Sequence, residues 1–129
     1  MALSGKIEES QVVRAAINLK KLDDPERLIK FVSDAISQYP NFATNTILIQ
    51  NRARAKMDLA KKCINTGKDK NSTQKTKARA WEMCRQLLSE AERDLNVAYE
   101  NTESAVDKTY LNKDFDFLRR MKENSRKPR

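Results

Sequence analysis

Residues 52–85 read RARAKMDLAKKCINTGKDKNSTQKTKARAWEMCR, which is two helix-forming halves joined by a short polar turn at Lys68-Asp69-Lys70. This stretch, the basic segment, holds eleven basic residues against three acidic ones, a net charge of +8. The whole 129-residue chain also has a net charge of +8, so the flanking segments are balanced. A positive field concentrated in this way favours a polyanionic partner. The basic residues are Arg52, Arg54, Lys56, Lys61, Lys62, Lys68, Lys70, Lys75, Lys77, Arg79 and Arg85.

Composition on both sides of the basic segment favours an all-α domain made of a few long helices. The chain has only two glycines and three prolines, which leaves few places to turn. With 34% charged and 39% apolar residues, its helices must be amphipathic. We expect one helical domain over residues 1–118, followed by a basic, flexible tail over residues 119–129.

Catalysis is disfavoured by what the sequence lacks. There is no histidine, which removes the commonest general base and a common zinc ligand. Neither glycine belongs to a phosphate-binding loop, and Glu90 with Asp94 resembles an ordinary exposed carboxylate pair. A nucleophilic Cys63 or Cys84 would lack a base. We therefore expect a protein that is not an enzyme and that needs no cofactor or metal.

The two cysteines are interpreted as reduced. If the turn centres near Asp69, Cys63 and Cys84 lie several helical turns apart along a hairpin, beyond bridging distance. The longest wholly aliphatic run is Ile47-Leu48-Ile49, so no signal peptide or membrane span is predicted. Together these observations favour an intracellular, cytoplasmic location, with the nucleus left open.

Apolar spacing and capping residues predict four main helices. The first covers about residues 7–22, and the second covers about 25–38, with Asp23-Asp24 as its N-terminal cap and Pro25 at its first position. The third runs from about 43 to 66, with Gly67 as a left-handed C-terminal cap. The fourth starts at Asn71 or Ser72 and continues past Thr109.

The fourth helix has the clearest periodicity in the chain. Apolar or small residues follow alternating steps of three and four, which predicts a heptad-like buried seam. Alanines recur every seven residues within it, so another helix could approach closely, either within the chain or in a homodimer. The seam consists of Trp81, Cys84, Leu88, Ala91, Leu95, Ala98, Thr102, Ala105 and Thr109.

These lengths predict a four-helix bundle from which the third and fourth helices project as a long antiparallel hairpin with a basic tip. The fourth helix would be about 55 Å long, so the first two helices would have to cover its C-terminal half. A short C-terminal helix is expected around Phe115, Leu118 and Met121. A second basic cluster, on the separate tail, includes Arg119 and Arg120.

Basic side chains on both arms of a hairpin favour non-enzymatic binding of a nucleic acid. Each contact with phosphate releases counterions and gives affinity that depends on salt and not on base sequence. Recognition of backbone and shape without base readout is typical of proteins that bind RNA duplexes, so RNA is weakly favoured over DNA. Trp81 could stack on a base, but its place on the seam favours core packing.

The alternative function is a protein–protein interaction or oligomerisation module. In that case the alanine seam would clasp a partner helix or form a homodimer, and the basic segment would dock on an acidic protein. Small basic helical proteins of this size are common among viral and plasmid accessory factors, which is a prior for the class only. Neither reading predicts a small-molecule substrate or a membrane.

Overall fold

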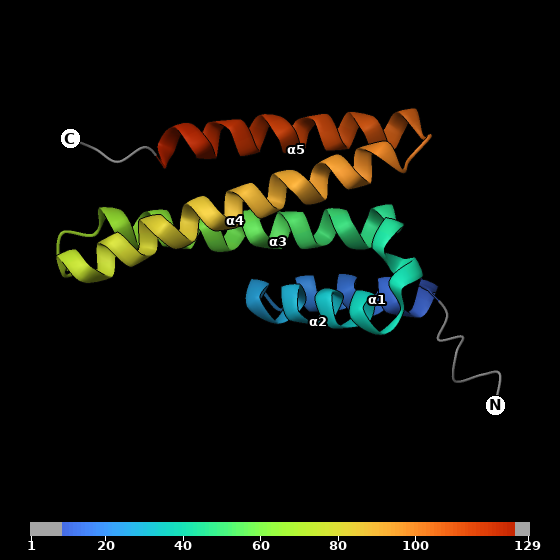
Figure 1. Ribbon diagram of the computed structural model, residues 1–129, viewed down its shortest axis with the longest axis horizontal. Coiled ribbons are helices and arrows are strands. Elements are labelled where there is room, and N and C mark those ends of the chain that lie inside the picture. Colours follow the sequence, from blue (N-terminus) through green and yellow to red (C-terminus); the bar gives the residue numbers. More distant parts are fainter. Residues whose placement is uncertain (1–8, 126–129) are drawn as a thin grey trace.

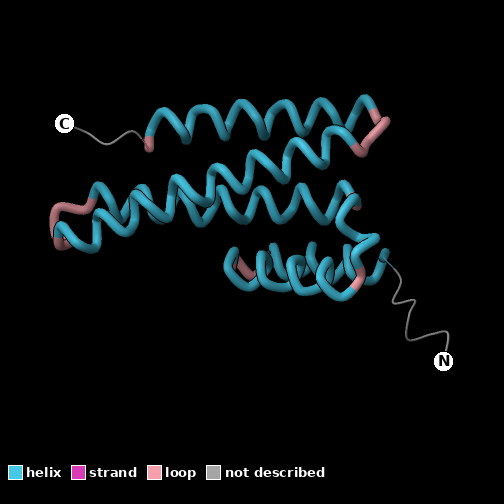
Figure 2. The backbone as a smooth tube through the Cα atoms, viewed as in Figure 1, coloured by secondary structure: helices cyan, strands magenta, loops and turns pink. Residues whose placement is uncertain are grey.

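The computed structural model describes residues 9–125, and within this range the secondary structure is helical without a strand (Figures 1 and 2). The all-α prediction is therefore confirmed, but the fifth α-helix is a long one and not the short C-terminal helix expected. A short 3₁₀ helix, η2, connects the second and third. The elements are α1 (Glu9–Lys20), α2 (Pro25–Gln38), η2 (Pro40–Thr44), α3 (Thr46–Lys68), α4 (Gln74–Glu100) and α5 (Ala105–Asn124).

The antiparallel pair α3 and α4 forms the centre of the molecule. Figure 1 shows α5 along one side of this pair and α1 with α2 along the other. The α3–α4 loop projects past α5 and past the α1–α2 pair in that view. The N-terminal helices pack on α3 through a cluster of buried side chains: Val12, Ala16, Leu28, Val32, Phe42, Leu48 and Ala55. The expectation that they cover the C-terminal half of the fourth helix was wrong, because α5 takes that place.

Local capping explains where the N-terminal helices begin and end. The Asp24 carboxylate accepts a hydrogen bond from the Arg27 backbone N–H, and Pro25 occupies the first turn, so α2 begins as predicted. It ends at Gln38, because Tyr39 precedes a proline and is excluded from the helical region. The third helix starts three residues later than expected, because residues 40–44 form η2 and Asn45 caps α3.

Gly67 is helical and does not cap α3 in a left-handed conformation. Helix α3 continues through Lys68, Asp69 is its C-terminal cap, and Gly67 has no positive φ. The start of α4 also differs from the prediction, because its cap is Thr73, which accepts from the Thr76 backbone N–H. Glycine is needed at 67 for space: a Cβ there would lie 2.5 Å from Cε2 of Trp81.

We expect Gly67→Ala to destabilise the fold although alanine is the better helix former. Helix propensity would add about 1 kcal/mol of stability, whereas overpacking against a buried indole costs about 1–3 kcal/mol. Chemical denaturation should therefore give a net loss of about 1 kcal/mol. Gly67→Ala in a Trp81→Phe background is the matched control, since the smaller ring relieves the clash. A loss of the same size in both backgrounds would contradict the packing explanation.

The single long fourth helix that the seam predicts is two helices in the structure. Helix α4 ends at Glu100, about 40 Å from its start, and the chain reverses into α5, a helix of 20 residues. The Ser104 hydroxyl accepts from the Asp107 backbone N–H and so caps α5. This serine with an acidic residue three positions later is the start signal that the seam periodicity obscured.

The C-terminal region therefore forms a helix of 20 residues along the α3–α4 pair and not the short helix expected. Helix α5 buries Leu111, Leu118 and Met121 against the α3–α4 pair. It continues past the domain boundary expected at residue 118, so residues 119–124 are helical. Residues 126–129, the rest of the expected tail, lie outside the described residues, as does the first part of the expected first helix.

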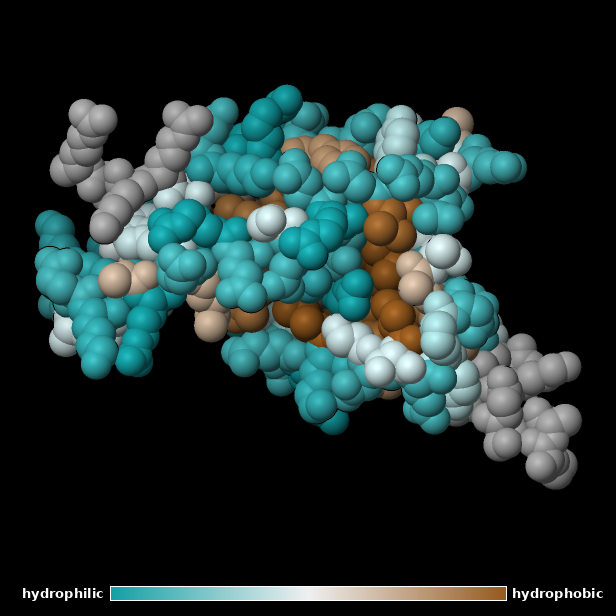
Figure 3. All heavy atoms as spheres, in the orientation of Figure 1, coloured by the Kyte–Doolittle hydropathy of each residue, from teal (hydrophilic) through white to brown (hydrophobic). Residues whose placement is uncertain are grey.

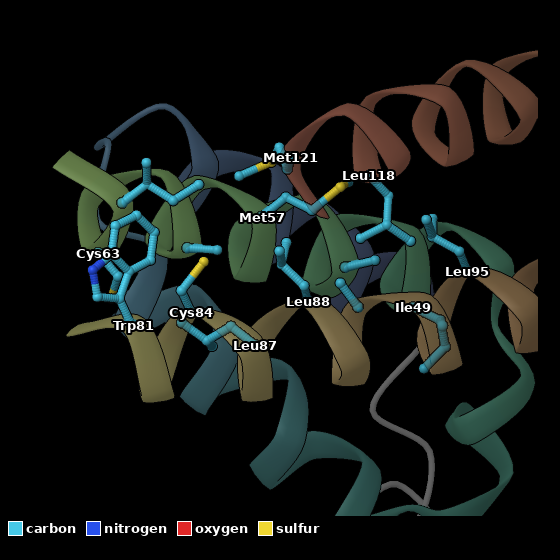
Figure 4. Close-up of a cluster of buried hydrophobic side chains, with 14 of the residues drawn as sticks. Ile49, Met57, Cys63, Trp81, Cys84, Leu87, Leu88, Leu95, Leu118 and Met121 are labelled. Atoms are coloured by element: carbon cyan, nitrogen blue, oxygen red, sulfur yellow. The ribbon is translucent and has the colours of Figure 1, made fainter. Parts of the chain in front are cut away.

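The seam on α4 is buried as far as Ala98 and forms the larger core with α3 and α5. Figure 4 shows its side chains, with Met57, Leu88, Leu118 and Met121 converging between the three helices. Beyond the α4–α5 turn the seam pattern has no structural meaning, because Ala105 and Thr109 are exposed on α5.

Cys63 and Cys84 are free thiols, as expected, but the predicted separation was wrong. Gly67 faces Trp81 on the loop side of the two cysteines, and Lys56 pairs with Glu90 on the other side of them. The two cysteines therefore lie at the same level of the hairpin, in one buried cluster. The error arose because the turn is centred later than Asp69.

Candidate functional site

The first basic residues of the basic segment form an ion-pair network between α3 and α4. Arg52 donates two hydrogen bonds of 2.9 Å to the Asp94 carboxylate and a third, of 3.2 Å, to the Ser33 hydroxyl. Lys56 Nζ lies 3.1 Å from the same carboxylate and 3.4 Å from Glu90. The side chains of Lys56 and Asp94 are each only 8% exposed, so these charges are directed at one another.

Arg54 is also committed within the chain, to α5. Its Nε atom lies 3.1 Å from the Asp114 carboxylate, which also accepts from Gln50 at 2.9 Å. Three of the eleven predicted interface residues, Arg52, Arg54 and Lys56, thus hold helices together. Asp94 was wrongly interpreted as exposed. Its position three residues after Ala91 and beside Leu95 would have placed it on the buried face.

An open cavity of about 670 Å³ lies beside this network, between α3 and α4. Arg52, Lys56 and Asp94 line its charged wall, and Ile49 and Val97 line its apolar wall. Arg52, Lys56 and Asp94 are already paired with one another, whereas Arg93, which also lines the cavity, is exposed.

The other eight predicted residues surround the hairpin tip, defined as residues 61–85. All are exposed except Lys77, which is half-buried. Seven of them form no ion pair with the part of the chain that the structure describes. The eighth, Arg85, pairs with Glu82 at 2.8 Å, but both side chains are more than half exposed, and such pairs contribute little stability. The seven are Lys61, Lys62, Lys68, Lys70, Lys75, Lys77 and Arg79.

These cations do not form a single row. Lys61 and Lys68 are seven residues apart and project from the same side of α3, whereas Lys62 lies about 100° around the helix from Lys61. On α4, Lys75 and Arg79 share a side. Lys75 is nine residues from the buried Cys84, about two and a half turns, so it lies on the outer side of the hairpin. In Figure 3 the projecting end of the molecule is covered mainly by hydrophilic side chains.

The two thiols do not supply a reactive centre. Burial raises the pKa of Cys63, and burial together with the neighbouring Cys63 raises the pKa of Cys84 to about 11. Both thiols are protonated near neutral pH, which is the unreactive form. Within residues 9–125, no group of three or more cysteine, aspartate or glutamate side chains is placed to hold a metal ion.

The alternative interaction surface is already occupied within the chain. Ala91 and Ala98 are fully buried in the core shared by α3, α4 and α5, so the alanine seam is not open to a second copy. Trp81 is also buried, which confirms the core reading over the base-stacking one.

No protein-family model, curated protein or solved structure matches this chain. Within the described range, no helix is long and apolar enough to cross a membrane.

Proposed function

We propose that the hairpin tip binds the phosphate backbone of a nucleic acid without catalysing a reaction. The observation that carries the proposal is that residues 61–79 hold seven basic side chains and one acidic residue, Asp69, and that none of the seven has an ion-pair partner among the described residues. Unpaired cations can exchange their counterions for phosphates without breaking a contact that stabilises the fold.

The distribution of charge favours recognition of backbone and shape. Base readout in a groove depends on a few side chains aligned on one element, whereas these cations surround both arms of the hairpin. RNA duplexes are recognised mainly through shape and backbone contacts, so RNA is favoured weakly over DNA. The core position of Trp81 is consistent with an interface that does not depend on stacking.

The experiment is a titration of duplex RNA, duplex DNA and single strands at several salt concentrations. If the tip contacts about five phosphates, log affinity against log salt should have a slope of about −4 to −5. Polyaspartate serves as a competitor that tests the alternative partner. If it displaces the duplex as effectively as unlabelled nucleic acid does, an acidic protein becomes the better candidate.

We expect Lys75→Glu with Arg79→Glu to weaken duplex binding several-hundred-fold, because the pair loses two contacts and adds two repulsive charges. The salt slope should flatten by about 2 units. Lys108→Glu with Lys113→Glu is the matched control, because both lysines lie on the first half of α5 and form no ion pair with a described residue. Equal losses in the two variants would show that net charge, and not the tip, determines binding.

A further inference from the structure

The fold brings a second basic cluster to the end of the molecule where the hairpin tip lies. Arg119, Arg120 and Lys122 are on the last two turns of α5. They are distant from the basic segment in sequence and were expected on a separate tail. Because α5 runs antiparallel to α4, its C-terminal end points toward the α3–α4 loop (Figure 1).

Specific contacts hold this end of α5 against the hairpin. Met121 and Leu118 are buried in the same core as Met57 and Leu88, and Figure 4 shows these side chains together. Lys122 Nζ lies 2.7 Å from a Glu92 carboxylate oxygen on α4. The position of residues 119–122 relative to the hairpin is therefore set by packing as well as by an ion pair.

The separation between the two clusters suits a continuous phosphate backbone. Lys122 Nζ contacts Glu92 on α4, and Arg85 lies seven residues closer to the loop, about 10 Å along α4. Arg79 is about 20 Å from the level of Glu92 on the same scale. Arg119 and Arg120 precede Lys122 on α5 and so lie about 3–5 Å farther from the loop. The two arginines are therefore roughly 14 Å from Arg85 and roughly 23 Å from Arg79 along the hairpin. At about 3.4 Å per base pair of B-form DNA, these intervals correspond to about four and seven base pairs.

Two of the three cations are available to a ligand. Arg120 is exposed and forms no ion pair with a described residue. Arg119 pairs with Asp116 at 2.7 Å, but the two side chains are 71% and 53% exposed, so the pair stabilises the fold little. Lys122 pairs with Glu92 and so positions the end of α5 against α4.

We infer that Arg119 and Arg120 form one composite phosphate-binding surface with the hairpin tip. This inference depends on the proposed function and extends its site to a second element. The inference also means that Arg119 and Arg120 are not suitable as a control for net charge. A reversal of these two arginines removes contacts from the site and does not merely alter bulk electrostatics.

The test compares three charge reversals in duplex RNA binding, each changing the net charge by the same amount. They are Arg119→Glu with Arg120→Glu, Lys108→Glu with Lys113→Glu on the same helix, and Lys75→Glu with Arg79→Glu at the tip. We expect the arginine pair to lose about tenfold more affinity than the lysine pair on α5, and to flatten the salt slope by about 2 units. Thermal melting checks that each variant is folded.

Arg119→Gln with Arg120→Gln removes the two positive charges without adding negative ones. Local repulsion from Glu123 therefore cannot explain the effect of this variant. It should flatten the slope to a similar extent, since the same two contacts are removed. One outcome is that the Arg119/Arg120 and Lys108/Lys113 variants bind duplex RNA with equal affinity while the tip variant binds it weakly. The composite surface is then wrong and the proposed function stands. If all three variants behave alike, the tip itself is not the site.

Discussion

Asp94→Ala should destabilise the protein by about 3–5 kcal/mol, because it removes the carboxylate shared by Arg52 and Lys56. Lys56 would then be a buried cation with only Glu90 nearby, at 3.4 Å. A loss of that size is a large fraction of the about 5–15 kcal/mol that holds a typical domain folded. Chemical denaturation followed by circular dichroism measures it directly.

Two controls separate the buried ion pair from the loss of any carboxylate. Asp116→Ala removes an exposed partner of Arg119 and should change stability by less than about 1 kcal/mol. Arg52→Met and Lys56→Met combined with Asp94→Leu remove all three charges of the shared contact, and should recover much of the loss. If Asp94→Ala were as mild as Asp116→Ala, the network would not stabilise the fold as the burial of Lys56 and Asp94 predicts.

Leu95→Ala should cost about 2–5 kcal/mol of unfolding free energy. Leu95 is fully buried where α3, α4 and α5 meet, so truncation loses apolar burial and leaves a cavity. Thermal and chemical denaturation should both report the loss, with helix content retained in the folded baseline.

Glu100→Ala on the same helix is the matched control, since Glu100 is exposed and forms no ion pair with a described residue. Its effect should stay within about 0.5 kcal/mol. Glu92 is a poorer control because it pairs with Lys122. A similar cost for Leu95→Ala and Glu100→Ala would mean that the seam is not the core.

Helices whose ends carry strong local signals could be predicted from the sequence. Asp24 followed by Pro25, and Tyr39 followed by Pro40, act through bonds and steric limits within a few residues. The α4–α5 reversal was missed because the spacing of three and four continued through Thr102, Ala105 and Thr109. Spacing indicates which side of a helix is apolar, but it does not show whether the helix continues.

The candidate site was predicted only in part, for a similar reason. Formal charge indicated eleven cations, but the acidic partners of Arg52 and Arg54 lie 42 and 60 residues away in sequence. Nothing local distinguishes those arginines from Arg79, which is exposed. The burial of Asp94 could be predicted from its place beside the seam residue Leu95. Asp114 on α5 could not be assigned to Arg54 without the chain reversal.

The sequence by itself determined the helical class, the amphipathic faces and the concentration of basic residues between 52 and 85, because these depend on composition and on periods of a few residues. Tertiary structure decided where α5 packs once the chain folds back after Glu100, since Leu111, Leu118 and Met121 need an apolar partner that α3 and α4 supply. It also decided which cations are paired and that the end of α5 lies beside the hairpin. Ion pairs and packing join residues that are distant along the chain, and their geometry exists only once the helices are assembled.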